Sequence, residues 1–210
     1  MTNRPVIFFD WDGTLADSMP LCLAEIRLAL ERMGMPALPE ALLAQCNGPT
    51  YEESVQVLGI PDARAKEFLR ERKEAEMALV PTVQRLFPGV REMLSALREV
   101  ADLAIVSNGM PEYLALSLRV MGLEDVFRRV QGQIPGKTKG EALALLLAEL
   151  SPARAVMVGD RLGDLLAGQE NGLPTVAACY GYGNETEYAH ADERADTVEA
   201  LTVLLKAMLA

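Results

Sequence analysis

The chain has 210 residues, of which 50% are hydrophobic and 24% charged, a composition typical of a folded, soluble globular protein. Its formal net charge of -10 argues against a broad nucleic-acid footprint, because such binding depends on clustered lysine and arginine. The apolar runs are too short to span a bilayer and the first residues do not resemble a signal peptide, so we expect a cytoplasmic protein with no nucleic-acid or membrane partner.

The first predicted element is a strand at residues 5–9, PVIFF. A continuous apolar run bounded by turn residues is typical of a strand that is buried on both faces of a parallel sheet. Two aspartates, Asp10 and Asp12, follow this strand at once, with Gly13 directly behind them. Two like charges at this position need an explanation.

A helical segment separates this strand from the next. Leucine, isoleucine and methionine recur at helical spacing along residues 23–33, and residues 63–79 form a long, charged amphipathic pattern. No convincing strand interrupts them. We therefore predict a small helical domain over residues 16–81, inserted into a core made of residues 1–15 and 82–210.

The second half of the chain alternates strands with helices. Apolar runs at residues 103–106, 155–158 and 174–178 predict strands, and residues 90–97 and 143–150 each place their apolar side chains on one helical face. This alternation predicts an α/β fold with a doubly wound, Rossmann-like parallel sheet.

Small or acidic residues follow three of the predicted strands, and such strand ends meet at one edge of a doubly wound sheet. Close carboxylates there would repel one another by about 4 kcal/mol per pair at an effective dielectric constant near 20, so we expect a cation among them. The residues concerned are Asp10, Asp12, Gly13 and Thr14, then Ser107, Asn108 and Gly109, then Gly159, Asp160 and Asp164.

The residue types at this edge favour magnesium. The chain has one histidine and three scattered cysteines, which is too few for a zinc site or a Ser-His-Asp arrangement. Oxygen ligands from few carboxylates, beside a phosphate, are typical of Mg²⁺. Asp10 and Asp160 are the first candidates to bind it.

Positive and polar groups that could bind a phosphate lie near the same edge. Lys137 and Lys139, in PGKTKGEAL, stand at a predicted helix start. Ser107 offers a hydroxyl, and the backbone amides around Asn108 and Gly109 could form an anion-binding nest.

These segments resemble the motifs of the haloacid dehalogenase superfamily of aspartate-dependent phosphotransferases. DWDGT resembles the first motif, VSNG the second, TKGEAL the lysine motif and GDRLGD the last, in the same order. The helical insertion resembles a C1-type cap, and NGLPTVAACYGYG resembles the corresponding segment of phosphoglycolate-phosphatase-like members. The likeness covers nearly the whole chain.

The resemblance implies a role for each aspartate. Asp10 would attack phosphorus to give an aspartyl-phosphate, and Asp12 would act as general acid and then as general base. Mg²⁺ would be bound by the side chain of Asp10, the main-chain carbonyl of Asp12 and the carboxylate of Asp160, with Asp164 supporting the metal.

The resemblance also implies a set of phosphate-binding groups. These are Thr14, Ser107, Asn108 and Lys139, although Lys137 would match a longer form of the lysine motif. We therefore expect a Mg²⁺-dependent phosphatase that acts on a small phosphorylated metabolite, with phosphoglycolate-like, sugar-phosphate and nucleotide substrates all open.

Other functions compete with this one. A phosphosugar mutase of similar architecture would hand the phosphate to a substrate rather than to water. A receiver-type signalling domain also combines these groups, but it needs neither a helical insertion nor Asp12. A dehalogenase is disfavoured because it has no use for that second aspartate. The oligomeric state is open.

Polar residues of the insertion are harder to assign. We expect Arg70, Arg72 and Lys73 to lie on a solvated helix face. The segment CNGPTYEES either lies over the active site or only caps a helix, and the residues concerned are Asn47, Thr50 and Glu53.

Overall fold

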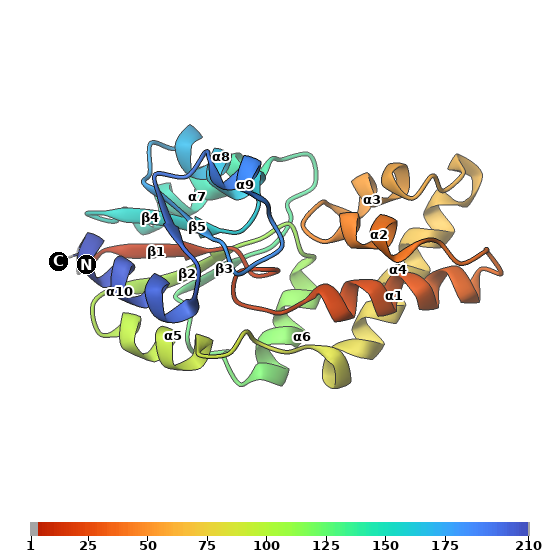
Figure 1. The fold of residues 1–210 in the computed structure, drawn as a ribbon, viewed down its shortest axis with the longest axis horizontal. Helices are drawn as coiled ribbons and strands as arrows, with labels where there is room; N and C mark the ends of the chain where they lie inside the picture. Colours follow the sequence, from red (N-terminus) through yellow and green to blue (C-terminus); the bar gives the residue numbers. More distant parts are fainter. Residues whose placement is uncertain (1–3, 210) are drawn as a thin grey trace.

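The computed structural model describes residues 4–209 and places a six-stranded sheet at the centre of the larger part of the molecule (Figure 1). All neighbouring strands run parallel, in the order β3-β2-β1-β4-β5-β6. The chain thus winds outward from β1 in one direction and from β4 in the other. The strands are β1 (Val6–Phe9), β2 (Asp102–Val106), β3 (Arg129–Gln131), β4 (Ala155–Gly159), β5 (Thr175–Ala178) and β6 (Glu193–Ala195).

Helices cover both faces of this sheet because side chains alternate along each strand. Ile7 and Phe9 belong to one apolar cluster with α5, α6 and α10, whereas Val6 and Phe8 pack on the other face with α7. The predicted α/β fold is confirmed. The helices are α5 (Val90–Arg98), α6 (Pro111–Met121), α7 (Lys139–Leu150), α8 (Leu162–Glu170), α9 (Glu185–Tyr188) and α10 (Val198–Leu209).

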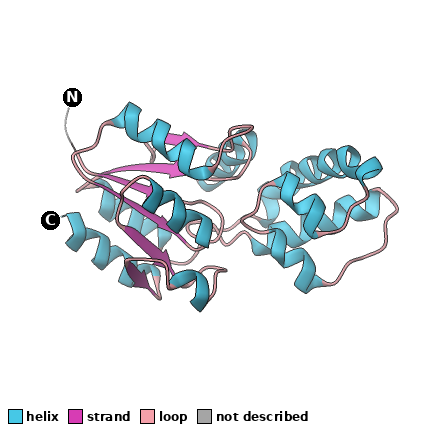
Figure 2. Cartoon of the chain, turned by 90° about the horizontal axis from the view of Figure 1, so that it is seen from above, coloured by secondary structure: helices cyan, strands magenta, loops and turns pink. Residues whose placement is uncertain are grey.

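The segment between β1 and α5 is helical and lies to one side of the sheet (Figures 1 and 2). It has an apolar cluster of its own, which includes Ile26, Leu30 and Phe68. Its elements are α1 (Met19–Arg32), α2 (Glu40–Leu43), the 3₁₀ turn η1 (Ala44–Cys46), α3 (Tyr51–Val57) and α4 (Asp62–Val83).

The return from this helical segment differs slightly from the prediction. Helix α4 accommodates Pro81 in its last turn and ends at Val83, two residues beyond the expected boundary. The chain then runs back beside the outgoing segment, where the backbone N–H of Asp17 donates to the carbonyl of Arg85 at 3.0 Å. The two connections therefore lie side by side.

Strands β3 and β6 were not predicted, and both lie at an edge of the sheet. Each has three residues, with exposed charged side chains such as Arg129 and Glu193. Such strands lack the apolar run that marks a buried one. Among residues 4–209, none of the helices combines the length and the apolar character needed to cross a bilayer.

Candidate active site

The chain turns sharply at the end of β1. The N–H of Asp10 still donates to the carbonyl of Val158 at 2.9 Å, so the pairing with β4 continues to this residue. Gly13 has a φ of +82°, and a Cβ placed there would lie 2.2 Å from Oδ2 of Asp160. The turn therefore needs glycine both for its backbone conformation and for the close approach of a carboxylate.

Three aspartates form a buried cluster: Asp10 follows β1, Asp160 follows β4, and Asp164 lies in the first turn of α8. One carboxylate oxygen each of Asp10, Asp160 and Asp164 lies within 4.8 Å of the others, and the three residues are at most 2% exposed. The hydroxyl of Thr14 donates to Oδ1 of Asp160 at 3.2 Å, and the N–H of Tyr182 donates to its Oδ2 at 2.8 Å. These bonds fix the carboxylate of Asp160 against the β1 turn.

Lys139 provides the positive charge of this cluster. It is the first residue of α7, whose start is stabilised by a capping box between Thr138 and Glu141. Its Nζ lies 2.9 Å from Oδ1 of Asp10 and also pairs with Asp164. Lys137, the alternative from the sequence, has an exposed side chain. The geometry thus favours Lys139.

Burial and mutual repulsion perturb the protonation of these groups. Burial, then the charge of Asp164, raises the pKa of Asp10 well above its usual value, although Lys139 opposes this. Burial and Asp164 likewise raise the pKa of Asp160 to about 7. Burial alone would lower the pKa of Lys139, but the carboxylates of Asp10 and Asp164 raise it. The one ammonium therefore pairs with two of the three carboxyl groups.

The three aspartates fit a divalent metal ion. All the donors are carboxylate oxygens, which suits a hard cation such as Mg²⁺. Oδ1 of Asp10 is buried and has no hydrogen bond of suitable geometry among the described residues, so it retains a lone pair for a ligand. A bound cation would also allow the carboxyl groups to ionise together.

Asp12 directs its side chain elsewhere. Its Oδ1 accepts a 2.6 Å hydrogen bond from the hydroxyl of Tyr113, which itself accepts one from Nε2 of Gln84 at 3.3 Å. Burial raises the pKa of Asp12, and the bond from Tyr113 partly opposes that effect. The carboxylate of Asp12 does not belong to the aspartate cluster. The expected contact between the main-chain carbonyl of Asp12 and a metal ion stays a prediction. Tyr113 was not foreseen from the sequence.

The residues after β2 also contribute to the site, beside those that follow β1 and β4. Ser107 is 4% exposed, and its Oγ accepts a 3.0 Å hydrogen bond from the N–H of Gly109. The side chain of Asn108 instead reaches the helical segment, where its Nδ2 donates to the carbonyl of Gly48 at 3.1 Å. Asn108 thus joins the sheet to the insertion, and both residues line the cavity described next.

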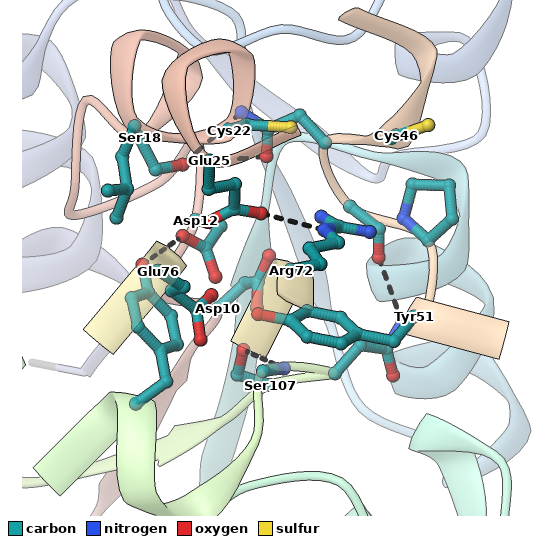
Figure 3. A pocket seen from close by; sticks show the side chains of 17 residues that line it. Asp10, Asp12, Ser18, Cys22, Glu25, Cys46, Tyr51, Arg72, Glu76 and Ser107 are labelled. Carbon is teal, nitrogen blue, oxygen red and sulfur yellow. Dashed lines mark hydrogen bonds and ion pairs between the residues drawn. The ribbon is translucent and has the colours of Figure 1, made fainter. Parts of the chain in front are cut away.

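A cavity of about 40 Å³ lies between the sheet edge and the insertion (Figure 3). The core lines it with Asp10, Asp12 and Ser107, and the insertion lines it with Glu25, Arg72 and other residues. The remaining lining residues are Ser18, Leu21, Cys22, Cys46, Asn47, Gly48, Pro49, Tyr51, Glu76, Asn108, Gly109 and Tyr113.

The prediction that Arg72 is solvated is wrong. Its side chain is 4% exposed, because α4 packs against α1 and the guanidinium pairs with the buried carboxylate of Glu25. Arg70 and Lys73 have side chains that are 63% and 42% exposed, as expected for a solvated face.

Both interpretations of the segment CNGPTYEES apply, but to different residues. Thr50 and Glu53 form a capping box at the start of α3. Asn47 and Gly48 line the cavity, and the carbonyl of Asn47 accepts a 2.8 Å hydrogen bond from Nη1 of Arg161.

Comparison with known protein families gives a match over most of the chain. The profile of the haloacid dehalogenase-like hydrolase family matches residues 7–178. The chain belongs to this family. The resemblance inferred from the four motifs is thereby confirmed, and this hydrolase has its aspartates where those motifs lie.

Similar proteins cover the chain almost end to end. A phosphoglycolate phosphatase of Synechococcus elongatus is 29% identical over 95% of this hydrolase and 98% of its own length. A 5'-nucleotidase of Pseudomonas aeruginosa is 30% identical over 87% and 86%, respectively. A solved haloacid dehalogenase-like family hydrolase from Streptococcus pneumoniae has the same fold, with a TM-score of 0.87 at 23% identity, over 99% of this chain and 100% of its own.

Proposed function

We propose that this hydrolase is a Mg²⁺-dependent phosphatase of small phosphorylated metabolites, working through an aspartyl-phosphate, with residues 16–81 as its cap. The buried cluster of Asp10, Asp160 and Asp164 beside Lys139 carries the proposal. Relatives named for the hydrolysis of phosphoglycolate and of nucleotides support the reaction class.

Two aspartates carry the covalent chemistry. A carboxylate oxygen of Asp10 attacks phosphorus, and the bond from phosphorus to the leaving alcohol breaks as Asp12 gives that alcohol a proton. Water then attacks the aspartyl-phosphate while Asp12 takes its proton, which releases phosphate and restores Asp10. The raised pKa of Asp12 suits a group that must be protonated at the first step.

The remaining residues hold the phosphate in place. Asp10, the main-chain carbonyl of Asp12, Asp160 and Asp164 would hold Mg²⁺, which would supply positive charge that offsets repulsion between carboxylate and phosphate. Other contacts come from Lys139, Ser107, the backbone around Asn108, and Thr14, whose hydroxyl also donates to Asp160.

The proposal is tested by phosphate release from a panel of phosphorylated metabolites, with and without Mg²⁺. The wild type should release phosphate only with the metal, Asp10→Asn should lose about a thousandfold or more of kcat, and Asp12→Ala should also be inactive. Circular dichroism should show that both variants are folded.

Two results would contradict it. Normal turnover in Asp10→Asn would show that Asp10 is not the nucleophile. A wild type that releases no phosphate but retains it stably on Asp10 would indicate a mutase or a phospho-accepting signalling domain instead.

A further inference from the structure

The insertion lines its side of the cavity with a second charged group, centred on Arg72. The guanidinium donates to Oε1 of Glu25 at 2.8 Å and to Oγ of Ser54 at 2.7 Å, and it lies 4.1 Å from the ring centre of Tyr51. Arg72 is the one arginine or lysine among the described residues that line this cavity. Its charge is therefore already committed to partners within the protein.

Two other polar groups line the same side of the cavity. Oε2 of Glu76 and the hydroxyl of Tyr51 are buried and interact with each other, but neither has a hydrogen bond of good geometry among the described residues (Figure 3). Glu76 is 5% exposed and Tyr51 is 9% exposed. Poorly paired buried polar atoms are costly, so these two atoms are open to a ligand that can hydrogen-bond with them.

The charges in this wall disfavour an anionic ligand. The one cationic side chain among the described residues that line the cavity, Arg72, is already paired with Glu25 and donates to Ser54. A carboxylate entering here would lose its hydration without gaining a cation. A hydroxyl can both donate and accept a hydrogen bond, so it can pair with Tyr51 and with Glu76 in either protonation state.

We propose that Tyr51, Arg72 and Glu76 form the subsite for the leaving alcohol and select phosphate esters of uncharged hydroxylated alcohols over esters that carry a carboxylate. This inference rests on the proposed phosphatase function. It predicts that phosphoglycolate is a poor substrate, although relatives are named for it.

Two esters of nearly equal size test the selection. 2-Hydroxyethyl phosphate and 2-phosphoglycolate end in a hydroxyl and a carboxylate group, respectively. We expect kcat/KM with Mg²⁺ to be at least about tenfold higher for the hydroxyl ester than for 2-phosphoglycolate. Glycerol 3-phosphate should exceed 3-phosphoglycerate in the same way.

The outcomes separate the two proposals. No release from any ester, including an aryl phosphate, contradicts the phosphatase itself. An equal or higher kcat/KM for 2-phosphoglycolate than for 2-hydroxyethyl phosphate contradicts only the selection against a carboxylate.

Variants locate the selection in this wall. Glu76→Gln removes the acidic group, so the preference for 2-hydroxyethyl phosphate over 2-phosphoglycolate should shrink severalfold. Glu74→Gln is the matched control on the same helix, because its side chain is 56% exposed, and it should leave the ratio unchanged. An unchanged ratio in folded Glu76→Gln would overturn the assignment.

A second variant guards against a folding defect in the first. Tyr51→Phe removes one hydroxyl and keeps the ring under Arg72. It should raise KM for 2-hydroxyethyl phosphate several-fold and leave KM for 2-phosphoglycolate unchanged. Equal effects on both esters would indicate a merely structural role.

Discussion

Tyr113 binds the carboxylate of Asp12, which we propose as the acid–base group. It lies on α6, far along the chain from Asp12, yet its hydroxyl donates to Oδ1 of that carboxylate at 2.6 Å. This bond holds the side chain away from the aspartate cluster and keeps its pKa from rising further. We therefore regard Tyr113 as a positioning residue for the acid–base group.

Tyr113→Phe should lower kcat by about tenfold to a hundredfold, because hydrogen bonds to charged groups contribute roughly 1.5–3 kcal/mol. The pKa of Asp12 should rise, so the limb of the pH–rate profile that requires its protonated form should move to higher pH. Steady-state kinetics across pH measures both effects.

Tyr188→Phe is the matched control for this variant. The hydroxyl of Tyr188 is buried but has no hydrogen-bond partner among the described residues. Its removal should leave kcat and the pH profile as they are. A Tyr113→Phe enzyme with an unchanged profile would show that the tyrosine does not act on Asp12.

Predictability from sequence differed sharply among the site residues. The aspartates and Lys139 stand at strand ends or a helix start, so their local sequence marks them. Tyr113 and Glu25 lie within helices, where function depends on which helix packs opposite. A signal did exist for Arg72 and Glu76, which follow buried Phe68 at intervals of four residues and so share its apolar face. Charged residues on an apolar face need a buried partner.

At the scale of elements, the turn after β1 is tightly constrained. Gly13 combines a left-handed backbone with a side-chain position that Asp160 already occupies. Any side chain there must displace this carboxylate, and with it the bonds from Thr14 and Tyr182.

Gly13→Ala should therefore reduce both stability and Mg²⁺ affinity. The left-handed conformation alone costs about 1–2 kcal/mol for a residue with a Cβ, and the contact with Asp160 adds to it. Gly34→Ala provides the control, since Gly34 has a φ of +64° and no neighbouring atom lies within 4 Å of the position that its added methyl group would take.

Chemical denaturation and Mg²⁺ titration of both variants separate these effects. Gly34→Ala should lose only the conformational part of the unfolding free energy and should bind Mg²⁺ normally. Equal losses of stability and equal Mg²⁺ affinity in the two variants would show that the approach to Asp160 has no consequence.

The sheet could be predicted only where its strands are buried on both faces. β1, β2, β4 and β5 are apolar runs and were expected within a residue or so of their bounds. The edge strands β3 and β6 pair through their backbones while exposing charged side chains, so their sequences resemble loops. Their positions depend on the neighbouring strand rather than on their own residues.

At the scale of the molecule, polar contacts beside the cavity join two separately packed parts. Asn108 and Arg161 extend from strand ends of the core and donate to the carbonyls of Gly48 and Asn47, respectively. Both acceptors belong to one loop of the insertion. The loops after β2 and β4 therefore both contribute residues to the candidate site and bind the insertion. A movement of the insertion would change both substrate access and the position of these loops.

Without metal, the free energy of unfolding should fall as pH rises toward neutrality, and bound Mg²⁺ should offset this fall. Asp160 has a folded pKa of about 7, against an unfolded value near 3.8. The folded state then binds the proton more tightly, so this contribution is full below about pH 4 and is lost as pH rises through 7. Without metal, the full loss is on the order of 4 kcal/mol. Mg²⁺ binds the ionised carboxylates and should restore stability at pH 7.5 more than at pH 5.

Thermal unfolding with EDTA or with saturating Mg²⁺, at pH 5 and pH 7.5, measures this reversal. We expect Mg²⁺ to raise Tm by several degrees at pH 7.5 and by little at pH 5. Other acids also titrate in this range, so Asp160→Asn isolates the effect: it should weaken the Mg²⁺ response and flatten the metal-free loss between the two pH values. If Mg²⁺ did not change the Tm of the wild type at pH 7.5, this result would contradict a metal site at the aspartate cluster. A ligand that binds only the folded state must stabilise that state.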